Sequence, residues 1–177
     1  MTRRVLGLVV AAAALFAPAA AAQSPAPPPQ LQGTFQMAGT VTVAENVRGE
    51  HPGEVVQRTW TFSSLCPPGP CATVRLARQR ATGTDTLLLH QTGPQSYVGT
   101  GQFYAPLLCS GRVYRPGQAI PFKITVRVTA SVPSATGLGA SAIRASYVNS
   151  SRVNLTPCIG VLGHDSASYS GQLVPAA

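Results

Sequence analysis

The sequence predicts an all-β domain, an antiparallel meander of eight to ten strands folded as an up-and-down barrel. Two observations lead to this prediction. Apolar and polar residues alternate with a period of two along most of the chain, and short turn signals separate these segments at fairly regular intervals. No window of a dozen residues after the N-terminus has the 3.6-residue period of a helix. A two-sheet β-sandwich is the alternative, because it is built from the same short antiparallel strands.

The first 32 residues precede the predicted domain. Residues 1–22 carry two arginines, then an apolar run that ends in three alanines, which is the layout of a secretory signal peptide cleaved between Ala22 and Gln23. The arginines leave the general secretory and twin-arginine routes open, and we expect no transmembrane helix to be retained. Residues 23–32 form a proline-rich spacer, and residues 33–177 form one all-β domain. We expect a bacterial protein that is secreted or held at the cell envelope.

The alternation defines the strands in order. The first runs over 35–43, with apolar residues at Phe35, Met37, Val41 and Val43. Later strands have their apolar residues at Trp60 and Phe62, at Ala72, Val74 and Leu76, at Phe122, Ile124, Val126 and Val128, and at Ile143, Ala145 and Tyr147. Shorter candidates cover 86–90, 97–104, 107–114 and 166–173. Glycine and proline mark the turns between them, at 48–49, 52–53, 67–70, 93–94, 116–117 and 133–139.

Four cysteines follow the expected cleavage site, and an even number in an exported chain predicts two disulfides. We favour Cys66 with Cys71, because the intervening PPGP is a turn sequence that brings its own ends together. Cys109 then pairs with Cys158. A zinc site is disfavoured, since the chain has no C-x2-C pair and its three histidines are scattered.

The segment RTWTF at residues 58–62, followed by CPPGPCATV at 66–74, resembles small exported actinobacterial β-modules with disulfide bonds. These modules have two more distant cysteines and a late Tyr-x-Gly, which Cys109, Cys158 and Tyr169-Ser170-Gly171 match here. The resemblance implies a disulfide-bonded β fold. It implies no activity, because such modules are mostly of unassigned function.

Composition restricts the chemistry. The chain has 13 Lys and Arg against 5 Asp and Glu, a formal charge of +8, and only 10% of its residues are charged. So few acids and histidines leave little material for acid–base catalysis. Nucleic-acid binding is not expected, because aromatic residues are 6% of the chain, the basic residues are dispersed and no recognised binding signature occurs. An anionic envelope polymer, a lipid or a small ligand is the partner expected for this charge.

Two sets of residues are candidates for binding. Arg58 shares its strand face with Trp60 and Phe62, and Arg78 and Arg80 share one with Val74 and Leu76 if that strand continues without a bulge. Inward arginines need an anionic partner, because an unpaired buried charge is costly; the alternative is a strand that ends near Ala77. The resulting ligand site consists of Arg58, Trp60, Phe62, Arg78, Arg80 and Tyr147. Lys123, Arg127 and Arg144 fall on polar strand faces and form an expected basic surface stripe.

We therefore expect an exported, non-enzymatic β domain that binds a small or anionic ligand at the cell envelope. No cofactor, catalytic residue or metal site is expected. The first alternative is a structural or interaction module that uses its basic surface. The second is a hydrolase that uses the loop with Glu50, His51 and Glu54, or else His164 and Asp165; adjacent residues of one strand, however, point to opposite faces and do not converge.

Overall fold

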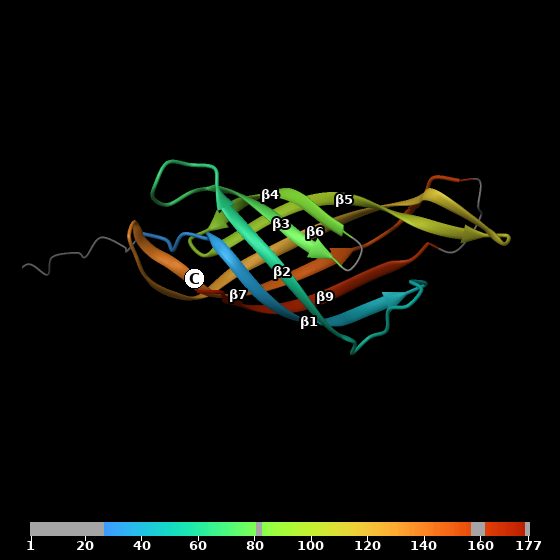
Figure 1. Cartoon of the computed structure of the whole chain (residues 1–177), viewed down its shortest axis with the longest axis horizontal. Helices are drawn as coiled ribbons and strands as arrows, with labels where there is room; N and C mark the ends of the chain where they lie inside the picture. Colours follow the sequence, from blue (N-terminus) through green and yellow to red (C-terminus); the bar gives the residue numbers. More distant parts are fainter. Residues whose placement is uncertain (1–26, 81–82, 157–161, 176–177) are drawn as a thin grey trace, which may run out of the picture.

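The computed structural model describes residues 27–80, 83–156 and 162–175. All regular structure in these residues is β-strand, as the period-two pattern predicts (Figure 1). The strands are β1 (Gly33–Glu45), β2 (Val55–Ser64), β3 (Thr73–Arg80), β4 (Gly83–Gly93), β5 (Ser96–Cys109), β6 (Arg112–Ser134), β7 (Gly137–Asn149), β8 (Val153–Asn154) and β9 (His164–Leu173). The described residues contain no helix that is long and apolar enough to cross a membrane.

The strands form a closed antiparallel barrel. Their order is β5-β4-β3-β2-β1-β9-β7-β6-β8, and an additional pairing of β5 with β6 closes the sheet into eight strands. Most neighbours in the barrel are consecutive in sequence, so this is the predicted up-and-down barrel and not the sandwich. The ninth strand, β8, pairs with Gln118 and Ala119 of β6, beyond the point where β7 ends. β8 therefore lies next to β6 where a longer β7 would lie.

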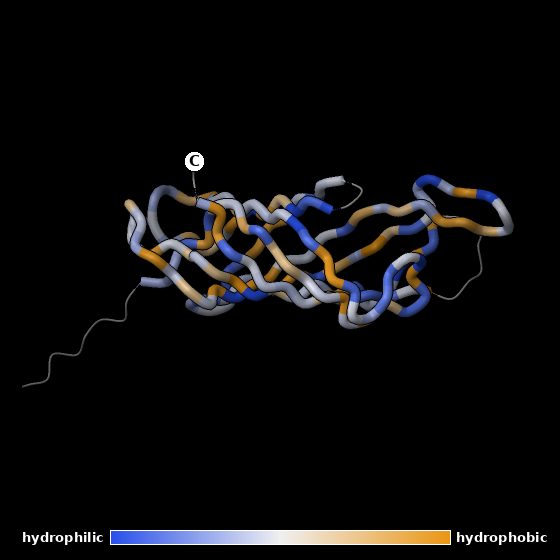
Figure 2. The backbone as a smooth tube through the Cα atoms, turned by 60° about the horizontal axis from the view of Figure 1, so that its bottom comes forward, coloured by the Kyte–Doolittle hydropathy of each residue, from blue (hydrophilic) through white to orange (hydrophobic). Residues whose placement is uncertain are grey.

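The interior is packed with side chains from the apolar face of each strand. On β1, for example, Phe35, Met37 and Val41 are buried while Gln36 and Thr40 are exposed. The backbone colouring in Figure 2 shows the same alternation of hydrophobic and hydrophilic residues along the strands. Trp60 and Phe62 lie at the centre of the core, and the Phe62 ring meets the Phe35 ring edge-on at 5.5 Å. The barrel is filled over this part of its length.

Two predicted boundaries are wrong. The candidate strand at 107–114 is the end of a hairpin, because Ser110 and Gly111 have positive φ angles of 49° and 77° and connect β5 to β6 as a type I′ turn. The predicted turn at 116–117 lies inside β6. Three residues of β6, 115–117, lie opposite Pro106 of β5, so proline and glycine mark a bulge here and not the end of a strand.

The first strand begins at Gly33, and two residues before it contact the barrel. Gln30 hydrogen-bonds through its backbone to Leu138 and Ala140, and Leu31 is 1% exposed within the core. These two residues were expected to belong to the spacer. The apolar Leu31 is what distinguishes them from the prolines before it, since it packs inside the end of the barrel.

One predicted disulfide is present. Cys66 and Cys71 are bonded across the turn between β2 and β3, with their Cα atoms 5.5 Å apart. Cys109 is not a free thiol. Its predicted partner Cys158 lies outside the described residues, so that pairing stays a prediction.

Candidate functional site

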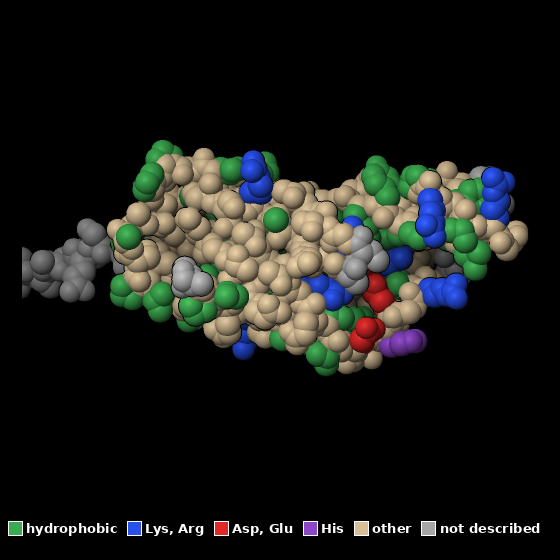
Figure 3. Space-filling model, viewed as in Figure 1, with side chains coloured by type: hydrophobic (Ala, Val, Ile, Leu, Met, Phe, Trp, Pro, Cys, Tyr) green, Lys and Arg blue, Asp and Glu red, His purple; other side chains and the backbone are tan. Residues whose placement is uncertain are grey.

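One end of the barrel is hollow. A cavity of about 500 Å³ opens where β1, β2, β3, β5, β6, β7 and β9 approach the loops of that end. Its apolar lining includes Val56, Phe103, Ile120, Tyr147 and Tyr169. Its charged lining consists of five arginines and three carboxylates, namely Arg48, Arg58, Arg78, Arg80 and Arg152, with Glu50, Glu54 and Asp165. Basic and acidic side chains are visible close together right of centre in Figure 3. We call this cavity the mouth of the barrel.

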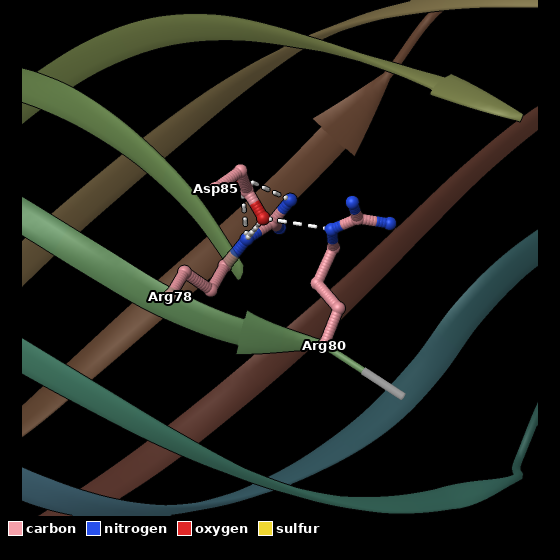
Figure 4. Close-up of polar contacts among 3 residues, drawn as sticks. All are labelled: Arg78, Arg80 and Asp85. Carbon is pink, nitrogen blue, oxygen red and sulfur yellow. Dashed lines mark hydrogen bonds and ion pairs between the residues drawn. The ribbon is translucent and has the colours of Figure 1, made fainter. Parts of the chain in front are cut away.

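Two of these arginines share one carboxylate. β3 continues without a bulge to Arg80, and its pairing places Asp85 of β4 directly opposite Arg78. Asp85 accepts hydrogen bonds from Nε and Nη2 of Arg78, at 3.2 and 2.9 Å to Oδ2, and from Nε of Arg80 at 2.8 Å to Oδ1. Figure 4 shows the carboxylate between the two guanidinium groups. The alternative of a strand ending near Ala77 is therefore wrong, and part of the charge is neutralised within the chain.

The same guanidinium groups cover the aromatic floor of the mouth. The Cζ atom of Arg78 lies 4.4 Å from the Phe122 ring centre and 4.9 Å from that of Tyr147. The Cζ atom of Arg80 lies 4.1 Å from the Phe103 ring centre. Cation–π contacts of this kind hold a guanidinium flat against a ring and leave its edge open to hydrogen-bond acceptors. The mouth thus places cationic groups directly above aromatic surface.

A second buried ion pair lies on the opposite wall. Arg152 donates from Nη2 to Oδ1 of Asp165 at 2.9 Å, and both side chains are nearly buried. Nε of Arg152 is buried and has no hydrogen-bond partner among the described residues. Burial and the neighbouring Asp165 carboxylate raise the pKa of Tyr147, so its phenol stays neutral. Burial, reinforced by Asp165, also raises the pKa of Glu50.

Arg58 differs from these arginines. Its Nη1 donates to the carbonyl of the adjacent Gln57 at 2.8 Å, but no ion pair links Arg58 to a carboxylate among the described residues. The pairing of β2 with β3 stops at Trp60 and Arg78, so the two strands separate beside Arg58. A second hollow of about 240 Å³ lies there and is lined by Arg58 and Arg80 together with four polar residues of β1, β2 and β3. Arg58 and Arg80 therefore face both hollows.

The structure brings together four of the six residues assigned to the ligand site. Arg58, Arg78, Arg80 and Tyr147 line the mouth. Trp60 and Phe62 do not line it, because they lie deeper in the packed core at 0% and 1% exposure. Period two predicted their inward orientation correctly but not their depth along the barrel. Trp60 contacts the mouth indirectly, since its ring centre is 5.1 Å from that of Tyr169.

The predicted basic stripe lies on the outer wall. Lys123, Arg127 and Arg144 are exposed on β6 and β7, and Arg127 pairs directly opposite Arg144. These two like charges face solvent side by side and lie apart from the mouth.

The residues of the hydrolase alternative do not form a catalytic arrangement. The backbone N–H of His51 donates to Glu54 at 3.4 Å, within an exposed loop. His164 lies 3.6 Å from Glu45, and its neighbour Asp165 is paired with Arg152. In the part of the chain described, no three His, Cys, Asp or Glu side chains are grouped as metal ligands.

Several important residues of this region were not assigned to the ligand site from sequence. Asp85 and Asp165 are partners of the arginines, Arg152 comes from the segment between β7 and β8, and Phe103 and Tyr169 supply aromatic surface. Asp85 could have been found from the sequence. It follows the two inward arginines at the start of the next strand, and a residue that pairs with Arg78 across a hairpin lies on the same face of the sheet. Arg152 and Asp165 had no local signal.

The fold and the site define a class: a small eight-stranded up-and-down β-barrel with an arginine-rich mouth above an aromatic floor. Comparison of the chain with protein-family models, curated proteins and solved structures finds no match to any of them.

Proposed function

We propose that the protein is an exported, non-enzymatic binding domain that holds one small organic anion in the mouth of its barrel. The observation that carries this proposal is Arg58, a guanidinium that lines the mouth and makes no ion pair with a carboxylate among the described residues. Arginine presents a planar set of donors suited to carboxylate, sulfonate or phosphate groups. An anion there would meet Arg58 and Arg80 together.

The rest of the lining favours an amphipathic ligand. A volume of about 500 Å³ accommodates a small organic molecule of up to about three rings, and Phe103, Ile120 and Tyr169 add apolar surface to the lining. The lining carries five arginines against three carboxylates, and Asp85 behind them adds a fourth. The remaining positive charge disfavours a cationic ligand.

Export is the second part of the proposal. The N-terminal sequence has the features of a signal peptide, and the Cys66–Cys71 disulfide suits an oxidising compartment. A binding domain outside the cytoplasm would meet small anions at the cell envelope.

Native mass spectrometry of the protein secreted by its own host is the first experiment. We expect an additional mass, lost on denaturation, that corresponds to one small organic anion. A protein that carries no such mass and binds none of a panel of aromatic and aliphatic carboxylates, sulfonates and phosphates would contradict the proposal.

A titration tests the site itself. The probe is 8-anilinonaphthalene-1-sulfonate, and its uncharged analogue N-phenyl-1-naphthylamine tests the need for the anion. Binding is followed by fluorescence of the probe and of Trp60, the single tryptophan, which contacts Tyr169 in the mouth. We expect one site that prefers the sulfonate. Arg58→Gln should lower the affinity for the sulfonate about tenfold, because about that factor in affinity is lost with one hydrogen bond to a charged group.

The matched control is Arg127→Gln, which removes the same charge from the outer wall. It should leave the sulfonate affinity within about twofold of the parent, because it is screened from the mouth. Equal losses in both variants would mean that the probe responds to net charge and not to this cavity.

A further inference from the structure

The hairpin of β5 and β6 has features that the mouth does not explain. It is the part of the described chain that projects furthest at the right-hand end of Figure 1. The type I′ turn at Ser110 and Gly111 forms its tip, and Leu108 pairs with Val113 just behind the turn. We call residues 104–115 the finger.

Large apolar side chains of the finger face solvent. Tyr104, which also lines the mouth, is 58% exposed, and Leu108 and Val113, which do not line it, are 54% and 49% exposed. The surface continues onto the adjoining segment that contains β8, where Val153 and Leu155 are 50% and 47% exposed. Figure 2 shows hydrophobic and hydrophilic residues following one another around the tip. Several large exposed apolar side chains on one projecting hairpin and the segment beside it indicate an interaction site.

Basic residues accompany this apolar surface. Arg112 and Arg115 are exposed beside it, and the Cζ atom of Arg112 lies 5.2 Å from the ring centre of Tyr114. Between Asp85 and Asp165 the sequence contains no acidic residue but six lysines and arginines. Apolar and basic side chains accordingly lie next to one another at this end in Figure 3.

We propose that the finger docks on the surface of an anionic lipid bilayer. Leu108 and Val113 enter the interface between headgroups and acyl chains, Tyr104 lies at headgroup depth, and Arg112 and Arg115 contact the anionic headgroups. A soluble polyanion is the other partner of opposite charge, but it would gain nothing from the exposed aliphatic side chains. Their position at the tip, together with the flanking arginines, favours lipid. This proposal does not depend on the ligand in the mouth.

The experiment measures co-sedimentation of the exported, disulfide-bonded protein with vesicles at low salt. Vesicles of phosphatidylcholine with about 30% phosphatidylglycerol are compared with vesicles of phosphatidylcholine alone. Each arginine near an anionic surface contributes about fivefold in affinity, so we expect binding to the anionic vesicles at least tenfold stronger than to the neutral ones. Added salt should weaken it. No sedimentation with anionic vesicles would overturn the proposal.

Two double variants separate the apolar and ionic parts. Leu108→Ser with Val113→Ser should lower the affinity for anionic vesicles about tenfold or more, and Arg112→Gln with Arg115→Gln should do the same and reduce the salt dependence. All these side chains are exposed, so the fold should remain intact, which circular dichroism checks. Two results together would overturn the lipid assignment and identify a surface for polyanions. The serine variant would bind anionic vesicles as strongly as the parent does, and the parent would bind inorganic polyphosphate as strongly as it binds the vesicles.

The controls use equally exposed residues elsewhere. Val132→Ser with Val174→Ser alters two aliphatic side chains, each 44% exposed, away from the finger and should leave vesicle binding within about twofold of the parent. Arg127→Gln with Arg144→Gln tests the outer stripe in the same way. If the stripe variant loses binding and the finger variants keep it, the docking surface lies on β6 and β7 and the proposal fails. Arg58→Gln should have no effect here.

Discussion

Asp85 lies directly across the β3–β4 ladder from Arg78 and pairs with its guanidinium, whose Cζ atom lies 4.4 Å from the Phe122 ring centre. The shortest contact between the two side chains is 2.9 Å, and their exposed fractions are only 6% for Arg78 and 10% for Asp85. One carboxylate thereby allows a charged residue to cover the aromatic core at the mouth of the barrel. In the proposed site, an external anion would meet Arg58 on the neighbouring strand, which makes no ion pair with a carboxylate among the described residues.

Asp85→Asn should destabilise the protein by about 3 kcal/mol, because it leaves Arg78 and Arg80 without their shared carboxylate in a nearly buried position. Urea unfolding followed by Trp60 fluorescence measures this. Glu45→Gln is the control, since its side chain is 66% exposed and its contact with His164 is at the surface. Equal unfolding midpoints in parent and Asp85→Asn would contradict the structural role of the ion pair.

The same substitution has an opposite consequence for binding. Asp85→Asn removes the negative charge that an external anion must compete with at Arg78 and Arg80, so the variant should bind 8-anilinonaphthalene-1-sulfonate more tightly than the parent and should regain stability as the probe is added. Affinity that falls in the folded variant would show that the probe does not contact these arginines.

Glu50 should make stability depend on pH. Burial, reinforced by Asp165, raises its pKa above 4.5, so the folded state binds the proton more tightly than the unfolded state. Above its raised pKa, Glu50 is charged and lowers the free energy of unfolding. As the pH falls through that pKa toward 4.5, Glu50 is protonated in the folded state and the lost stability is recovered. Glu50→Gln should be more stable than the parent at pH 7, and the difference should shrink to nothing below pH 4.5.

Urea midpoints between pH 4 and 8 measure the effect of Glu50, with Glu54→Gln from the same loop as the exposed control. The affinity for the sulfonate probe should rise as the pH falls through the same window, because protonation of Glu50 removes a negative charge from the mouth. A difference between Glu50→Gln and the parent that is constant with pH would rule out the titration of Glu50 as the cause.

Gly39→Ala should displace the ring of Tyr169. Gly39 of β1 pairs directly with Tyr169 of β9, and a Cβ atom at Gly39 would clash with that ring. Displacing a packed ring costs about 1–3 kcal/mol, and the ring lines the mouth, so probe affinity should fall as well. Gly93→Ala is the matched control, because its Cβ would meet only Ser96 at an ordinary 3.9 Å. Equal stability of the two variants would contradict this packing.

Opening the Cys66–Cys71 disulfide should cost stability without affecting binding. The loop is short, and closing it contributes about 2 kcal/mol on the chain-entropy model. The turn joins the ends of β2 and β3 that point away from the mouth. Cys66→Ser with Cys71→Ser should therefore lower the urea midpoint while the affinity for the sulfonate probe stays within twofold. A large loss of affinity would mean that the two ends of the barrel are coupled.

The sequence by itself determined the all-β fold, the inward face of each main strand and the Cys66–Cys71 bridge. These depend on local rules: a period of two assigns every other side chain to one face, and a proline-glycine turn brings its ends together. For this reason Arg58 and Tyr147 could be placed on the inner face from sequence, and Arg78 and Arg80 as well if their strand continued without a bulge; all four line one cavity.

Only the tertiary structure decided how deep each inward residue lies and which charges meet. Trp60 and Arg58 share one face of β2, yet the first is buried in the core and the second lies at the mouth, because the pairing of β2 with β3 ends between them. Arg152 and Asp165 are brought together by the path of the chain around β8 and β9. The pairing of β5 with β6 closes the barrel only because β9 pairs with both β1 and β7, which are far apart in sequence. No local sequence pattern predicts which strands will be neighbours.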